Sequence, residues 1–299
     1  MNDINVIINI IKHCCKKISN IIKNSDSIEL STLSEQYNLS GDNAKKLDII
    51  ANSILMCELE KCELIRKIGS EEEEEIYNTP YVNAPYLICF DPLDGSSNIG
   101  VNITTGTIFA LYKYDNNVIA DGNNIILAGY CLYGGSTQLI IADKQVNMYQ
   151  LKKTSNINNE EEFILISESI KVPHKGNYYA INESNKYIWH DKRNGIIGDK
   201  LINEGYSARW VASLVADAHR TIIKGGFFSY PTNNKNINGK IRLLYEAYPF
   251  AYIFKIAGAK SLNGKGNTPL LDVPFPENCH QKTPIILSSP YEMNLFLSI

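Results

Sequence analysis

Two carboxylates in the segment 90–98, FDPLDGSSN, are the residues of this sequence best suited to chemistry. Asp91 and Asp94 follow an apolar run, and Pro92 and Gly95 are typical of a sharp turn at the end of a strand. Hard divalent cations such as Mg²⁺ prefer carboxylate oxygens. The segment therefore indicates a metal site, although two aspartates that only cap a turn fit the same spacing.

Two serines follow the aspartates directly, at Ser96 and Ser97. They can open a helix whose first backbone amides face an anion, so a phosphate could bind beside the metal. Further carboxylates could complete such a site, although a charged loop or a helix start explains each of them equally well. They are Asp42, Asp48, Glu71, Glu72 and Glu246.

The aspartates must be held by a strand, and the apolar run at 86–90 is predicted as that strand. Gly, Pro and Asn turn signals separate it from other strand-like runs. These are predicted at 64–68, 107–112, 125–133, 138–141 and 227–230. Together they predict a mixed sheet.

Helices are predicted where apolar residues recur with helical spacing. The predicted helices cover 4–22, a segment from the polar residues 40–42 to about residue 62, 210–223, and 243–257. The mixture of helices and strands predicts an α/β protein with a plausible boundary between two halves at 173–176.

The composition excludes several classes of protein. With 299 residues and 44% hydrophobic content, the chain can bury a sizeable core. Its 29 basic and 32 acidic residues give a net charge of −3, which does not favour nucleic-acid binding. No apolar run is long enough to span a membrane, and the start of the sequence does not resemble a secretory signal. We therefore expect a cytoplasmic protein whose seven cysteines are reduced.

Along nearly its whole length, the chain resembles the class I fructose-1,6-bisphosphatase family. The matching segments occur in the order that the family has. They are GDNAKKLD from Gly41, SEE from Ser70, FDPLDGSSN from Phe90, GTIFALY from Gly106, LAGYCLYGGST from Leu127, ARWVASLVADAHRT from Ala208 and NGKIRLLYE from Asn238.

The resemblance implies a layered α-β-α-β-α sugar-phosphatase fold with two mixed-sheet halves. Residues 1–173 would form an N-terminal, allosteric-type domain that carries most metal ligands, and residues 174–299 would form a substrate-binding domain. The implied reaction is metal-dependent hydrolysis of the 1-phosphate of fructose 1,6-bisphosphate in gluconeogenesis. The implied assembly is a homotetramer or a homodimer.

The resemblance also implies roles for individual residues. Mg²⁺, or Mn²⁺ or Zn²⁺ in its place, would be held by Glu71, Asp91, Asp94, Glu246 and the Leu93 carbonyl, with Asp42 in a mobile loop. Asp48 and Glu72 would orient or deprotonate the attacking water. Gly95, Ser96 and Ser97 would lie beside the scissile phosphate, and Asn182, Arg209, Tyr230 and Lys240 would grip the sugar and its second phosphate.

Three positions depart from the family pattern. Gly100 stands where an aspartate is usual, Asn185 where a phosphate-binding tyrosine is usual, and Trp210 replaces a tyrosine. These departures leave two alternatives open. The chain could act on the seven-carbon sedoheptulose 1,7-bisphosphate, or it could be a catalytically weakened regulatory or binding homologue.

Overall fold

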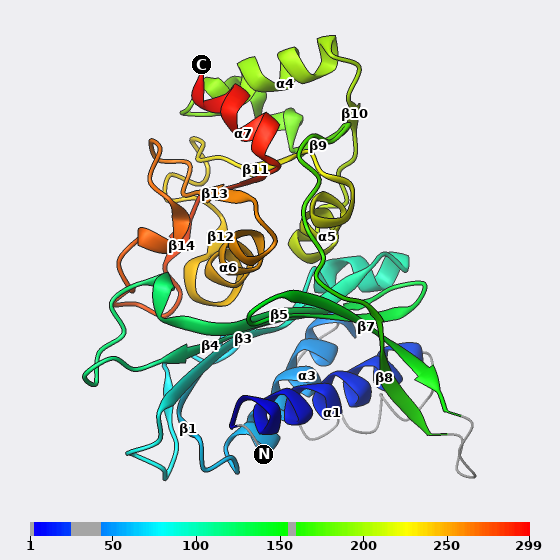
Figure 1. Cartoon of the computed structure of the whole chain (residues 1–299), viewed down its shortest axis with the longest axis vertical. Coiled ribbons are helices and arrows are strands. Elements are labelled where there is room, and N and C mark those ends of the chain that lie inside the picture. The colour runs from blue at the N-terminus through cyan, green and yellow to red at the C-terminus, as the bar shows by residue number, and fades with distance from the viewer. Residues whose placement is uncertain (1–2, 25–42, 155–159) are drawn as a thin grey trace.

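Helices and sheets alternate in five layers in the computed structural model, which describes residues 3–24, 43–154 and 160–299 (Figure 1). The outermost helices α1 and α3 cover one face of the first sheet, α5 and α6 lie between the two sheets, and α4 and α7 cover the second sheet. The helices are α1 (Asp3–Lys23), α3 (Asn43–Leu59), α4 (Arg193–Asn203), α5 (Leu214–Lys224), α6 (Tyr248–Ile256) and α7 (Pro290–Leu297). This is the layered α/β fold that the resemblance implied.

The first sheet contains eight strands among the described residues, in the order β2-β1-β3-β4-β5-β6-β7-β8. β1 and β3 are parallel, and the other neighbours are antiparallel. The strands are β1 (Ile65–Ser70), β2 (Tyr77–Asn78), β3 (Tyr86–Asp94), β4 (Thr105–Lys113), β5 (Ile125–Tyr133), β6 (Thr137–Ala142), β7 (Val146–Lys153) and β8 (Glu161–Ser167). The sequence predicted five of these runs and missed β2, β7 and β8.

The second sheet contains five strands in the part of the chain that the structure describes, in the order β10-β9-β11-β15-β13. It is also mixed, since β9 is parallel to both β10 and β11 while β15 is antiparallel to its neighbours. The strands are β9 (Tyr178–Ile181), β10 (Ser207–Ala208), β11 (Phe227–Tyr230), β13 (Lys260–Leu262) and β15 (Ile285–Ser288). A separate short pair joins β12 (Ile241–Arg242) to β14 (Lys282–Thr283).

The largest core fills the space between the two sheets. It joins residues of both halves of the chain, for example Leu87 on β3, Phe228 on β11 and Phe254 on α6. A second core lies beneath α1, which buries Ile7, Ile11 and Ile18 on one face, as the helical spacing predicted. The division into domains at residue 173 stays a prediction.

The predicted helix 210–223 begins four residues too early. α5 starts at Leu214, and residues 210–213 form an irregular connection in which Ala212 has a φ of 67°. The apolar residues Trp210 and Val211 continue the helical spacing but lie outside the helix, because the N–H groups of Val211 and Ala212 donate to the side chain of Asp217. The predicted helix 243–257 is confirmed, since a π turn (Leu243–Ala247) leads directly into α6.

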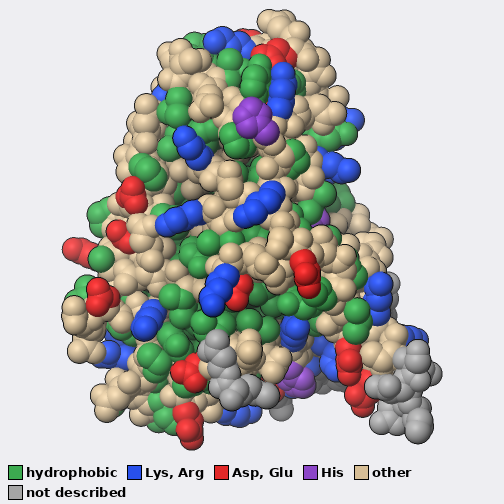
Figure 2. Space-filling view, viewed as in Figure 1, with side chains coloured by type: hydrophobic (Ala, Val, Ile, Leu, Met, Phe, Trp, Pro, Cys, Tyr) green, Lys and Arg blue, Asp and Glu red, His purple; other side chains and the backbone are tan. Residues whose placement is uncertain are grey.

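Acidic and basic side chains are interspersed on the face of the molecule in Figure 2, without a broad field of one sign. None of the described helices is both long enough and apolar enough to span a membrane.

Candidate active site

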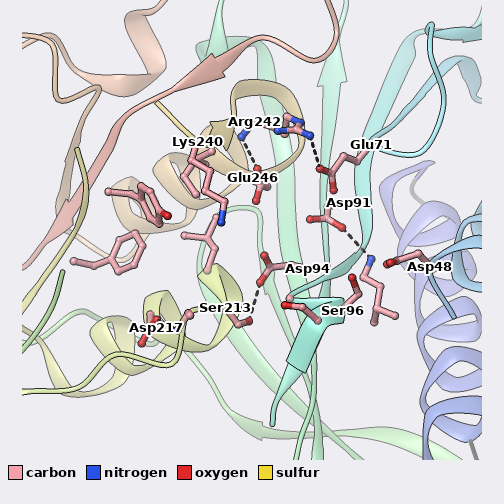
Figure 3. Close-up of a pocket in the computed structure, with 18 of the residues that line it drawn as sticks. Asp48, Glu71, Asp91, Asp94, Ser96, Ser213, Asp217, Lys240, Arg242 and Glu246 are labelled. Carbon is pink, nitrogen blue, oxygen red and sulfur yellow. Dashed lines mark hydrogen bonds and ion pairs between the residues drawn. The ribbon is translucent and has the colours of Figure 1, made fainter. Parts of the chain in front are cut away.

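A bulge in β3 places Asp91 and Asp94 on the same side of the sheet. Residues three apart on a regular strand point to opposite faces. Here Asp91 pairs with Ile108 and Asp94 with Gly106, so three steps along β3 match two steps along β4. The extra residue turns both carboxylates into one cavity (Figure 3).

The strand therefore continues further than the sequence predicted. The expected turn at Asp91 is wrong, because β3 runs through Asp94 and the chain turns at Gly95, which has a φ of 75°. Pro92 has no N–H to give to the ladder, and the N–H of Leu93 donates to the Asp91 carboxylate at 2.9 Å. The bulge thus satisfies its own backbone with a side chain of the site.

Glu246 reaches the same cavity from the π turn that precedes α6. Oxygens of Asp91, Asp94 and Glu246 lie within 4.8 Å of one another, and all three residues are at most 9% exposed. π turns often occur at functional sites, because the extra residue redirects one side chain of a helix. Three buried carboxylates at this separation form a donor set that suits a hard divalent cation.

The pKa values of these three carboxyl groups are all raised. Burial is the largest cause in each case, and for Asp91 and Glu246 the next cause is the neighbouring Glu71 carboxylate. Burial raises the pKa of Asp94 to about 6, although bonds from Val215 and Ser213 act in the opposite direction. A cation would favour the ionised form of the whole group, so the electrostatics agree with the donor set.

Glu71 stands at the edge of this cluster and is held by Arg242, a residue that the sequence analysis missed. The Arg242 guanidinium lies 3.1 Å from a Glu71 oxygen, and its backbone N–H donates to Glu246. The Nε of Arg242 is buried and has no hydrogen-bond partner in the described structure. The sequence could have pointed to Arg242 through its place four residues before Glu246, in the segment NGKIRLLYE.

The two carboxylates expected to act on water line the same cavity, whose volume is about 320 Å³. Asp48 comes from α3 and Glu72 follows Glu71 after β1. The Glu72 N–H donates to the hydroxyl of buried Ser70 at 3.2 Å. Two consecutive elements, α3 and β1, therefore supply carboxylates to the cavity of the β3 aspartates, and Figure 3 shows Asp48 beside them.

The residues expected beside the scissile phosphate also line this cavity. They are Gly95, Ser96 and Ser97, with Leu93 before them. Ser96 and Ser97 open a short 3₁₀ helix (Ser96–Val101). A Cβ on Gly95 would lie 2.8 Å from the Cβ of Ser213, so glycine is required both for the backbone angle and for this close approach.

An aromatic wall closes the other end of the cavity. Trp210 stacks on Phe228 at a centroid distance of 6.3 Å and lies 5.8 Å from the Tyr230 ring. The Lys240 ammonium lies 5.6 Å from the centre of the Tyr230 ring and provides a cation there. Trp210 and Phe228 were not among the predicted site residues.

The structure does not bring two predicted residues, Asn182 and Arg209, into this cavity. Asn182 precedes a 3₁₀ helix (Glu183–Ile188) and accepts a bond from Ser184 at 2.6 Å. Arg209 is exposed beside the Tyr178 ring and lines a different cavity of about 880 Å³. Asp42 lies outside the described residues.

Two further residues that line the cavity, Ser213 and Asp217, were not predicted from the sequence. Ser213 donates from its hydroxyl to Asp94 at 2.9 Å, and the N–H of Val215 donates to the same carboxylate oxygen at 2.8 Å. Asp94 thereby takes the place of a capping side chain at the start of α5. No spacing in the sequence links residues so far apart.

Comparisons with known proteins agree over the whole chain. The family model described as "Fructose-1-6-bisphosphatase, N-terminal domain" matches residues 1–168, and the corresponding C-terminal model matches residues 172–299. The class 1 fructose-1,6-bisphosphatase of Persephonella marina is 38% identical over 295 residues, which cover 96% of this chain and 89% of that protein. Fructose-1,6-bisphosphatase 1 of Bos taurus is 37% identical over 297 residues, covering 95% and 85%.

Solved structures give the same result. The holo form of Leishmania major fructose-1,6-bisphosphatase superposes with a TM-score of 0.85 at 32% identity, covering 99% of this chain and 94% of that one. The acidic cavity, the five layers and the matches over both halves therefore have one explanation. The chain belongs to the fructose-1,6-bisphosphatase family.

Proposed function

We propose that this chain hydrolyses the 1-phosphate of fructose 1,6-bisphosphate in a metal-dependent reaction that yields fructose 6-phosphate and phosphate. The observation that carries the proposal is the cluster of Asp91, Asp94 and Glu246 in a cavity that Lys240 also lines. The carboxylates suit a phosphate bound through cations, and the Lys240 ammonium suits an anionic group of the substrate. The relatives that match this chain are named for the same substrate.

The proposed cation is Mg²⁺, with Mn²⁺ or Zn²⁺ as substitutes. Asp91, Asp94, Glu246 and Glu71 would hold it together with the Leu93 carbonyl, and Asp42 is added from the family resemblance alone. Bound metal ions would neutralise the phosphate, lower the pKa of the attacking water and stabilise the leaving alkoxide.

The remaining steps fall to side chains around the cluster. Asp48 and Glu72 would orient the attacking water and accept its proton, because both face the carboxylates that bind the phosphate's cations. Gly95, Ser96 and Ser97 would contact the scissile phosphate. Tyr230 and Lys240 would bind the sugar and the second phosphate at the aromatic end.

Arg209 and Asn182 have proposed substrate roles that a single chain does not explain, since neither lines its own cavity. We propose a homo-oligomer, a tetramer or a dimer, in which Arg209 of one chain completes the cavity of another. Its exposed position on the surface agrees with this arrangement.

The seven-carbon bisphosphate remains the alternative substrate, since both sugars place a phosphate at each end. A weakened binding homologue is the alternative from another class, suggested by Gly100 and Asn185. Against it, the carboxylates proposed as metal ligands at Glu71, Asp91, Asp94 and Glu246 are all present.

The test is phosphate release by the purified full chain from the six-carbon and seven-carbon bisphosphates, with and without Mg²⁺. We expect Mg²⁺-dependent release that is faster with the six-carbon substrate. Asp94→Ala should lower turnover at least about a hundredfold while the melting temperature shows a folded protein. Asp199→Ala, which removes an exposed carboxylate paired with Lys186, is the matched control and should behave as wild type. A folded, metal-binding preparation with no activity on either sugar would leave the binding homologue as the better explanation.

A further inference from the structure

The connection 210–213 before α5 is held in a backbone conformation that its sequence does not favour. Ala212 has a φ of 67°, in the left-handed region where a Cβ crowds the backbone and glycine is preferred. A non-glycine residue stays there when its surroundings compensate for the strain. The compensating group can be identified.

Asp217 on the first turn of α5 is that group. Its carboxylate accepts hydrogen bonds from the N–H of Val211, at 3.0 and 3.1 Å to its two oxygens, and from the N–H of Ala212 at 3.1 Å. The residue is 1% exposed, and Arg220 on the next turn lies 3.5 Å from one of the oxygens. The same guanidinium donates to the Arg209 carbonyl at 3.4 Å, so two side chains of α5 fix the connection.

The connection carries two parts of the cavity at its two ends. Ser213 ends it and donates to Asp94, and its side chain lies so close to Gly95 that a Cβ there would come within 2.9 Å of the Ser213 hydroxyl. Trp210 begins it and forms the aromatic wall with Phe228 and Tyr230. A change in the backbone between them would move a metal-cluster carboxylate and the sugar end together.

We propose that Asp217 is a positioning residue of this site, which holds the strained connection 210–213 so that Ser213 orients Asp94 and Trp210 faces the sugar end of the cavity. The inference rests on the proposed function. Asp217 lines the cavity, but both oxygens of its carboxylate accept hydrogen bonds from the backbone, from the N–H groups of Val211 and Ala212. Its influence on the reaction therefore passes through the connection.

The variant Asp217→Asn tests the proposal. Its amide N–H₂ would replace an oxygen that now accepts a hydrogen bond from a backbone N–H, so two donors would face each other. We expect kcat/KM to fall about tenfold or more, with a higher KM for the bisphosphate and a higher Mg²⁺ concentration for half-maximal activity. Adding Ala212→Gly should recover a substantial part of that loss, because glycine adopts the left-handed conformation without the carboxylate. The recovery is measured as the kcat/KM of the double variant divided by that of Asp217→Asn. This ratio is then divided by the kcat/KM of Ala212→Gly relative to wild type.

Glu292→Gln provides the matched control. Glu292 is also fully buried and accepts a hydrogen bond from a backbone N–H, that of Gly176 at 2.7 Å, but it belongs to α7 and does not line the cavity. This variant should lose stability while KM and the Mg²⁺ requirement stay at wild-type values. A merely structural role for Asp217 would give the same pattern as Glu292→Gln, and that result would overturn the proposal.

Fluorescence of Trp210 gives a readout that does not depend on activity. The chain has two tryptophans, and the other, Trp189, is 3% exposed in a separate core, so Trp189→Phe leaves Trp210 as the reporter. In this background Asp217→Asn should make Trp210 more accessible to acrylamide. If the wild-type chain released no phosphate, the proposed function would fail while this measurement still tested the role of Asp217. Unchanged quenching would refute that role.

Discussion

Gly100, two residues after the segment FDPLDGSSN, stands where the family resemblance leads one to expect an aspartate. It lies in the 3₁₀ helix Ser96–Val101, and a Cβ placed on it would have no heavy atom of the described residues within 4 Å. A side chain therefore fits there without displacing a neighbour. The structure therefore has room at position 100 for the carboxylate that glycine lacks.

Gly100→Asp should consequently fold with a free energy of unfolding within about 0.5 kcal/mol of wild type. A carboxylate added to the 3₁₀ helix that begins with Ser96 and Ser97 of the cavity would attract cations, so we expect the Mg²⁺ concentration for half-maximal activity to fall about two- to tenfold. Mg²⁺ titrations of phosphate release measure this, and Gly100→Asn is the uncharged control of the same shape. If Gly100→Asp and Gly100→Asn changed the Mg²⁺ requirement equally, charge would be ruled out as the cause.

At the scale of single elements, the π turn before α6 depends on a tyrosine from the neighbouring sheet. Pro249 stands five residues after Leu244, where the π spacing would place a donor for the Leu244 carbonyl, and proline has no N–H. Tyr112 on β4 fills that role, because its hydroxyl donates to the Leu244 carbonyl at 2.9 Å in a fully buried position. The turn that directs Glu246 into the site is thus completed by a side chain distant in sequence.

Tyr112→Phe should leave the Leu244 carbonyl buried without a donor and lower the free energy of unfolding by about 1–3 kcal/mol. Urea denaturation measures this loss. Tyr252→Phe is the comparison, since its hydroxyl also donates to a carbonyl, that of Asp143 at 3.1 Å, in a partly buried position where water can replace it. A loss for Tyr112→Phe no larger than that for Tyr252→Phe would contradict the special role of the π turn.

At the scale of the whole molecule, the proposed homo-oligomer would bring Arg209 of one chain to the cavity of another, because Arg209 does not line the cavity of its own chain. If each chain supplies Arg209 to a neighbour, one chain with Asp94→Ala and one with Arg209→Ala together contain one intact site. Co-expression of the two variants with different tags should therefore restore about a quarter of wild-type activity in a randomly mixed dimer. Each variant alone should be far less active. Activity no greater than the sum of the single variants would exclude sharing of Arg209.

The elements that follow local rules were predicted well from the sequence. α1 repeats apolar residues with helical spacing, and β5 and β11 were predicted with the bounds that the structure has. The layered fold and the family followed from segments that resemble known proteins and were then matched by both halves of the chain. Asp91, Asp94 and Glu246 were also named from the sequence, although their meeting was implied by the resemblance and not by spacing.

Elements whose bounds depend on contacts outside their own apolar pattern were missed. Strand β7 and the edge strand β8 were not predicted, and α5 was given four residues that belong to the connection before it. Trp210 and Val211 fit a helix by pattern, but the Asp217 carboxylate holds that backbone outside the helix. Hydrogen bonds that form only after folding overrode the local preference.

The sequence by itself therefore determined the types of residue at the site, the strand that carries the two aspartates and the family to which the chain belongs. Only the tertiary structure decided that Asp91 and Asp94 share one face, because the bulge between them depends on pairing with β4. It also decided the places of Arg242, Ser213 and Asp217 around the acidic cluster. A local pattern records which face of an element is buried, whereas the contacts of Arg242 with Glu71 and of Ser213 with Asp94 join segments more than a hundred residues apart, and no spacing along the chain records them.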